Sequence, residues 1–196
     1  MPQTFIFIGR SGCGKGTQAK LLIDYLTAAK KTAPAKIFYL ETGARFREFI
    51  QEDNYSAQLA KQIMTDAGRQ PDFLAVWMWS HLLIEHITGE EDLVFDGLPR
   101  SLLEAQTLET AIKFYDRPAP TVIYLRASPE WAAERLKERQ RADDQTSANI
   151  AKRLAWFETD VVPALDWYRT QTRYRFWEFD GEQPIATIHQ DLITRL

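Results

Sequence analysis

Residues 5–17 constrain this chain more than any other stretch. The apolar run Phe5 to Ile8 stops at a turn that reads Gly-Arg-Ser-Gly-Cys-Gly-Lys-Gly-Thr over residues 9–17. Four residues separate Gly9 from Gly14 and Lys15 follows, which is the spacing of a phosphate-binding loop between a strand and a helix. Glycines let successive backbone N–H groups point at one anion, and the helix that follows directs its positive end to the same place. The stretch predicts a nucleotide-phosphate site rather than a glycine-rich turn with no ligand.

Composition limits the class of protein. The chain has 196 residues, 45% of them apolar and 26% charged, which suits one globular domain with a sizeable core. A net charge of −3 argues against a surface that coats nucleic acid. Cys13 is the single cysteine, so neither a disulfide nor a structural zinc site built on cysteines is expected. No leader and no apolar run long enough for a membrane span is visible, so we expect a cytoplasmic protein.

Short apolar runs alternate with helical patterns along the chain. We expect strands at residues 5–8, 36–40, 93–96, 121–125 and 174–179, with helices between them and a bend or break at Pro163. Such alternation predicts an α/β fold, a doubly wound five-stranded parallel sheet with helices on both faces. Ligands in such folds lie beyond the carboxyl ends of the strands.

Four segments, taken together and in order, resemble the adenylate kinase family of P-loop nucleoside monophosphate kinases. They are residues 9–18, Thr-Gly-Ala-Arg-Phe-Arg (42–47), Asp-Gly-Leu-Pro-Arg (96–100), and Arg-Ala-Asp-Asp-Gln (141–145) with Lys152-Arg153-Leu154 after it. The resemblance implies one P-loop kinase domain over residues 1–196, with a monophosphate-binding helical insertion at 41–72 and a minimal lid at 135–145. It also implies Mg²⁺-dependent phosphoryl transfer from ATP to a nucleoside monophosphate, by a protein that we expect to be a monomer.

The resemblance assigns site residues. For ATP it implies Gly12, Cys13, Gly14, Lys15, Gly16, Thr17, Arg135, Arg139 and Gln183. For the monophosphate it implies Thr42, Gly43, Arg47, Met64, Gly97, Arg100, Glu104, Arg141 and Arg153. For catalysis it implies Lys15, Arg100, Arg139, Arg141 and Arg153, and for Mg²⁺ Thr17 and, through water, Asp96. Phosphoryl transfer needs positive charge around the transferred group, and planar guanidinium groups match phosphate oxygens. Asp143 and Asp144 would tie the lid arginines in position, and Lys152 competes with Arg153 for the last lid role.

One departure from the family bears on the substrate. Four residues after Arg100, the family places a Gln that reads the edge of adenine, whereas this chain has Glu104. An ionised carboxylate only accepts hydrogen bonds, so it suits guanine's two adjacent donors better than adenine unless it is protonated. Gln106 is a candidate to replace that Gln as the residue that reads the base. At position 42, the Thr of this chain resembles the residue of the AMP-specific enzymes.

The expected function is therefore adenylate kinase activity (ATP + AMP = 2 ADP). The same chemistry on GMP, dGMP or CMP stays open. Two further alternatives stay open. One is a nucleotide-binding regulatory protein that has lost turnover, which the short lid would favour. The other is a small-metabolite kinase on the same scaffold. The tryptophans are expected to serve packing rather than base stacking.

Overall fold

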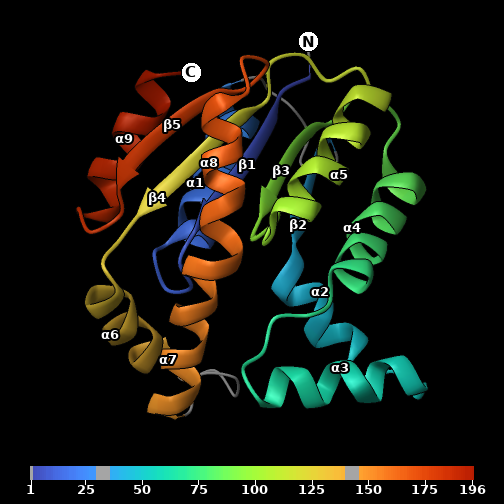
Figure 1. Ribbon diagram of the computed structural model, residues 1–196. Helices are drawn as coiled ribbons and strands as arrows, with labels where there is room; N and C mark the ends of the chain where they lie inside the picture. Colours follow the sequence, from blue (N-terminus) through green and yellow to red (C-terminus); the bar gives the residue numbers. More distant parts are fainter. Residues whose placement is uncertain (1, 30–35, 140–145) are drawn as a thin grey trace.

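The computed structural model describes residues 2–29, 36–139 and 146–196. Its centre is a parallel sheet of five strands in the order β2-β3-β1-β4-β5 (Figure 1). The strands are β1 (Thr4–Gly9), β2 (Ile37–Glu41), β3 (Asp92–Asp96), β4 (Thr121–Arg126) and β5 (Arg175–Asp180). The chain leaves β1 for the β2 edge, returns through β3 and then crosses to the other side of β1. The phosphate-binding loop thus follows the strand at which the winding reverses, where α/β sheets bind ligands.

Helices follow the strands in the predicted alternation. They are α1 (Lys15–Ala29), α2 (Thr42–Phe49), α3 (Tyr55–Thr65), α4 (Asp72–His86), α5 (Leu102–Phe114), α6 (Pro129–Arg139), α7 (Ser147–Trp156), α8 (Val162–Thr170) and α9 (Ile185–Thr194). The described helices include none that is long and apolar enough to cross a membrane. The expected fold class, a doubly wound α/β sheet with helices on both faces, is confirmed.

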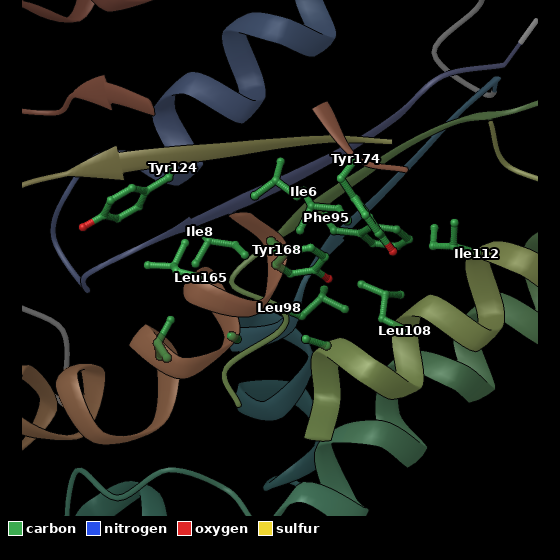
Figure 2. Packing of buried hydrophobic residues seen from close by; sticks show 14 of the residues in the cluster. Ile6, Ile8, Phe95, Leu98, Leu108, Ile112, Tyr124, Leu165, Tyr168 and Tyr174 are labelled. Carbon is green, nitrogen blue, oxygen red and sulfur yellow. The ribbon is translucent and has the colours of Figure 1, made fainter. Parts of the chain in front are cut away.

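One face of the sheet is covered by α4, α5 and α8. Ile6, Ile8 and Phe95 point from the strands toward Leu108 of α5 and Leu165 of α8 (Figure 2). These strand positions alternate with residues that face the other side, as the period of two in a strand requires. Burial of this cluster holds α5 and α8 against this face of the sheet.

The opposite face is covered by α1 and α9. Phe5, Phe7 and Val94 of the strands pack with Leu22 of α1 and Ile188 of α9. Because the strands are buried on both faces, they read as nearly continuous apolar runs in the sequence. Packing of α1 on this face fixes the helix whose first turn continues the phosphate-binding loop.

A third, smaller core lies within α2, α3 and α4. Phe46 and Phe49 of α2 pack against Ala57 of α3 and Met78 of α4. Asn54 caps α3 by accepting a hydrogen bond from the amide of Ala57. This unit lies to one side of the carboxyl ends of the strands, and α6 and α7 lie on the other side (Figure 1).

Pro163 does not end its helix. The helical run continues from α7 through a π-helical segment (Phe157–Val161) into α8. A proline removes one backbone donor and crowds the preceding turn, and the wider π turn immediately before it accommodates that change. Of the predicted bend or break at Pro163, a break is therefore not found, and the run instead changes to a π-helical turn just before the proline. The described part of the helix begins at Ser147, capped by Thr146, and the predicted start at Asp143-Asp144 lies outside the described residues.

Candidate active site

A cavity of about 600 Å³ lies at the carboxyl ends of the strands. Fifteen of the residues that the sequence assigned to the site line it: Gly12, Cys13, Gly14, Lys15, Gly16, Thr17, Gly43, Arg47, Asp96, Gly97, Arg100, Arg135, Arg139, Arg153 and Gln183. Segments that are far apart in the sequence therefore meet around one space, which is large enough for nucleotide ligands.

The phosphate-binding loop holds its lysine close to its own backbone. Lys15 Nζ donates to the carbonyl oxygens of Gly9 and Arg10, each at 2.7 Å, and lies 3.7 Å from Sγ of Cys13. The loop itself packs tightly on α6, since a Cβ atom on Gly12 would come within 2.8 Å of the carbonyl oxygen of Ala132, and its φ of +89° favours glycine. The ammonium group is thus placed at the mouth of the loop, beside the amides of an anion site.

Asp96 forms the floor of the cavity at the end of β3. It is 6% exposed, and its Oδ2 accepts a hydrogen bond from the hydroxyl of Tyr39 at 3.2 Å. Burial raises the pKa of the Asp96 carboxyl, the charge of Lys15 opposes this effect, and the neighbouring carboxylate of Glu41 adds to it. A buried carboxylate next to the phosphate loop is suited to attract a cation.

One wall of the cavity is formed at the start of α2. Arg47 donates to Oε1 of Glu41 at 2.8 Å, and the space over Gly43 is bounded by the guanidinium groups of Arg47 and Arg100. Thr42 is 1% exposed and lies behind this wall, with its hydroxyl 3.5 Å from the carbonyl oxygen of Asp96. Glu41 was not among the predicted site residues, although its position one residue before Thr42-Gly43 is visible in the sequence.

Arg100 and Arg153 bring two positive charges to the same region. Nε of Arg100 donates to the carbonyl oxygen of Gly97 at 2.8 Å. Burial lowers the pKa of Arg100, and the like charge of Arg153 lowers it further. Two guanidinium groups that repel one another in this way are stabilised by an anion between them. Lys152 is exposed and does not line the cavity, which favours Arg153 for the lid role.

The opposite wall is formed by α6 and the turn after β5. The guanidinium group of Arg135 lies 4.7 Å from the centre of the Trp131 ring, and both side chains line the cavity. Gln183 lines it from the other side and donates to Asp180. The tryptophans are expected to serve packing rather than base stacking, and Trp131 combines packing with a place in the cavity lining. The spacing of four residues between Trp131 and Arg135 on a helix is the signal that could have found this place.

Three predicted residues lie away from the cavity lining. Thr42 and Glu104 are buried, and Met64 is half-buried against the third core. Arg141, with Asp143 and Asp144 of the expected lid, lies outside the described residues. The cavity therefore contains the expected phosphate-binding groups from both sides, whereas the residues expected to contact the acceptor base lie behind its wall.

Glu104 has an unusual environment. It is 1% exposed, its amide is bound to the N-cap Ser101, and Arg69 is its nearest opposite charge at 3.7 Å. Burial raises the pKa of its carboxyl to about 7, against the opposing charges of Arg100 and Arg69. A carboxyl that changes its charge near neutral pH is typical of functional sites.

Comparison with known proteins agrees with this geometry. The family model described as adenylate kinase matches residues 7–173. The chain is 33% identical to the adenylate kinase of Cyanothece sp. (strain PCC 7425 / ATCC 29141), over 93% of this chain and 89% of that protein. It is 30% identical to adenylate kinase 1 of Synechocystis sp., over 98% and 96%, and 28% identical to the adenylate kinase of Flavobacterium psychrophilum, over 97% and 94%.

The chain belongs to the adenylate kinase family. It is a kinase of the nucleoside monophosphate kinase class, as the four sequence segments predicted. Membership in the adenylate kinase family agrees with a nucleotide cavity on a parallel sheet, with a phosphate-binding loop after β1.

The cavity fits the divalent cation that adenylate kinases use. Magnesium prefers oxygen ligands and keeps several waters and phosphate oxygens, so it needs only one or two protein groups. Asp96 and Thr17 line the cavity and supply such oxygens. Within residues 2–29, 36–139 and 146–196, no group of three or more His, Cys, Asp or Glu side chains forms a metal cluster. The donor set therefore suits a cation that a nucleotide brings with it.

Proposed function

We propose that this protein transfers the γ-phosphoryl group of ATP to AMP, forming two molecules of ADP. The observation that carries the proposal is the arrangement of the cavity. Lys15 and the loop amides line the cavity together with two groups of arginines, namely Arg135, Arg139 and Arg153 from α6 and α7, and Arg47 and Arg100 from the segments after β2 and β3. One anion site flanked by two arginine groups suits a phosphoryl group that passes between two nucleotides.

The donor would be held by the phosphate-binding loop and α6. The loop amides and Lys15 would bind the β- and γ-phosphates, and Thr17 would offer its hydroxyl. Arg135, supported by the Trp131 ring, would lie against the donor base, with the Gln183 segment on its other side.

The acceptor would be held by the segment 41–72. Arg47 and Arg100 would bind the monophosphate, so that its oxygen faces the γ-phosphorus in line with the leaving oxygen. Arg139 and Arg153 would neutralise the charge that spreads over the transferred group, and Arg141 would join them from the lid at 135–145. These arginines need no proton transfer of their own, since guanidinium groups stay charged at neutral pH.

Magnesium would be held by Thr17 and, through water, by Asp96. When bound, it would screen the phosphate charges and orient the donor. The residues of this chain then position the two substrates.

The test is a panel of all ribo- and deoxyribonucleoside monophosphates with ATP and Mg²⁺. The proposal predicts the highest kcat/KM with AMP, and loss of at least about 100-fold in the Lys15→Met variant, as expected when a preorganised charge is removed. Preference for a guanine or cytosine nucleotide would change the proposed acceptor but leave the proposed phosphoryl transfer unchanged. ATP binding without transfer to any acceptor would favour a regulatory nucleotide-binding role instead.

A further inference from the structure

We infer that Arg10 is a positioning residue of the phosphate-binding loop. Its side chain is held by Phe157 and Glu158 of the π-helical segment, and this anchor fixes the Arg10 carbonyl group that orients Lys15 for the donor phosphates. The inference rests on the proposed function, because the loop belongs to that same site. It adds a residue that supports the site from outside the cavity.

The backbone of Arg10 lies at the centre of the loop. Its carbonyl oxygen accepts a hydrogen bond from Nζ of Lys15 at 2.7 Å and a second one from the amide of Cys13 at 3.2 Å. Lys15 also donates to the carbonyl oxygen of the preceding residue, Gly9, at 2.7 Å. The direction of the Arg10 carbonyl group therefore sets both the position of the ammonium group and the turn of the loop.

The side chain of Arg10 is held outside the cavity. Its guanidinium group lies over the ring of Phe157, 4.4 Å from the ring centre, and its Nη2 donates to Oε1 of Glu158. The described residues that line the cavity include the loop from Ser11 to Thr17 but not Arg10. The guanidinium group of Arg10 therefore supports the loop rather than a nucleotide phosphate.

The anchor is more than an ion pair at the surface. The side chain of Glu158 is 53% exposed, and pairs between exposed charges contribute little to stability. The side chain of Arg10, however, is only 12% exposed, and Phe157 is 1% exposed within the core formed by the sheet, α5 and α8. A ring that the core holds in place thus adds a cation–π contact to the charge-assisted hydrogen bond. Contacts with both the face and the edge of the guanidinium group leave it one orientation.

The anchor belongs to the helical run that also carries Arg153. Phe157 and Glu158 are the first two residues of the π-helical segment, and Phe157 follows Arg153 by four residues, about one helical turn. Arg153 lines the cavity, whereas Phe157 contacts Arg10. One short stretch of helix therefore joins an arginine of the cavity to the loop that holds Lys15. Single π-helical turns are frequent at functional sites.

Release of the Arg10 side chain should leave Lys15 less ordered before ATP binds. Affinity falls when a site must be ordered on binding, because the cost of ordering reduces the free energy of association. Arg10→Met should therefore raise the Kd for ATP with Mg²⁺ by roughly two- to thirtyfold, the range that a cation–π contact supports. Hydrogen exchange at the amide of Cys13 should become faster, since its acceptor is the Arg10 carbonyl, while the amides of the sheet keep their rates.

Two further variants separate positioning from the charge of Arg10 itself. In the Lys15→Met background, Arg10→Met should change the Kd by less than about twofold, because the lysine through which it acts is gone. Glu158→Ala should weaken ATP binding, because it releases Arg10. As a change of charge alone it would strengthen binding, since it removes a negative charge that repels the phosphates. Glu158 is exposed, so this variant tests the inference even if Arg10→Met does not fold.

The experiment measures the Kd of ATP by calorimetry, with Mg²⁺ and without an acceptor, and amide exchange by NMR without any nucleotide. Arg169→Met is the matched control. The guanidinium group of Arg169 also lies over an aromatic ring, 5.2 Å from the centre of Phe176, and pairs with a carboxylate, Asp166, at 2.7 Å. Arg169 does not line the cavity, so its variant should keep the Kd and the Cys13 exchange rate of the wild type.

Neither readout depends on phosphoryl transfer, so ATP binding without transfer would contradict only the proposed function. Arg10→Met and Glu158→Ala should both show weaker binding and faster exchange at Cys13. Three results would each overturn the inference: an unchanged Cys13 exchange rate in Arg10→Met, a loss of affinity that persists in full without Lys15, or tighter ATP binding in Glu158→Ala.

Discussion

The position that a Cβ atom would take on Gly16 lies 3.0 Å from Oδ2 of Asp96. Many phosphate-binding loops have Ser or Thr directly after the lysine, whereas here the hydroxyl comes one residue later, at Thr17. The absence of a side chain at residue 16 lets the Asp96 carboxylate approach the start of α1. The hydroxyl at Thr17 and the position of the Asp96 carboxylate are therefore both related to the glycine at residue 16.

Gly16→Ala should lower kcat and raise the Mg²⁺ concentration needed for half-maximal activity, because the methyl group displaces the Asp96 carboxylate. Its effect on stability should be small, since alanine gains up to about 1 kcal/mol of helix propensity over glycine and offsets the tight contact. Mg²⁺ titrations of activity and urea unfolding measure the two quantities. In the Asp96→Ala background, the carboxylate that the methyl group would meet is gone, so the added Gly16→Ala change should have little further effect. Full additivity of the two changes would contradict this relationship.

Trp131→Ala should raise the KM for ATP by roughly three- to thirtyfold, because a cation–π pair of this kind contributes about 0.5–2 kcal/mol to holding Arg135 in place. The KM for the acceptor should stay nearly constant. Trp77→Ala is the matched control, since Trp77 lies on α4, stacked on His81 and away from the cavity lining. An equal rise in both KM values in Trp131→Ala would indicate a general structural role instead.

The stability of the fold should fall as the pH rises through neutrality. The pKa of Glu104 is about 7 in the folded protein, against an ordinary value of 4.5. The folded state therefore holds this proton more tightly, so the stabilisation is complete below about pH 4.5 and is lost as the pH rises through 7. The loss amounts to roughly 3 kcal/mol from this one group. Urea unfolding at about pH 5 and pH 8 should show this fall in the wild type and in Glu130→Gln, a control at an exposed glutamate of α6, and a smaller one in Glu104→Gln. Parallel falls in all three proteins would contradict it.

Arg69→Gln should raise the pKa of Glu104. The positive charge of Arg69 favours the ionised form of that carboxyl, so its removal stabilises the neutral form. Titration of the Glu104 carboxyl by NMR measures this shift. Arg69→Lys keeps the charge and should keep the pKa closer to that of the wild type. A pKa that is unchanged in Arg69→Gln would mean that the charge of Arg69 does not act on Glu104.

Much of the fold followed from local patterns. The run Phe5 to Ile8 and the glycines after it specify a strand and a turn by themselves, and the other apolar runs became strands for the same reason. The presence of the loop residues 12–17 in the cavity lining was predictable because one short motif carries them. The prediction of a bend or break at Pro163 left open how the helix passes the proline, because the π-helical turn before it has no local signal in the sequence.

Long-range pairs were beyond the reach of sequence patterns. Nothing in the sequence places Arg69 between Asp72, Asp160 and Glu104, which come from segments up to 91 residues apart. The burial of Glu104, and hence its raised pKa, depends on that packing. The presence of Glu104 in place of the family's Gln was visible in the sequence, but the charges that surround it in the fold were not.

The transfer of labelled phosphate from [γ-³²P]ATP to AMP, in the presence of Mg²⁺, tests the central claim most directly. The proposed function predicts label in the β-phosphate of ADP at a rate that falls at least about 100-fold in Lys15→Met. Label that stays in ATP, or that appears only as inorganic phosphate, with AMP and with every other nucleoside monophosphate, would contradict it.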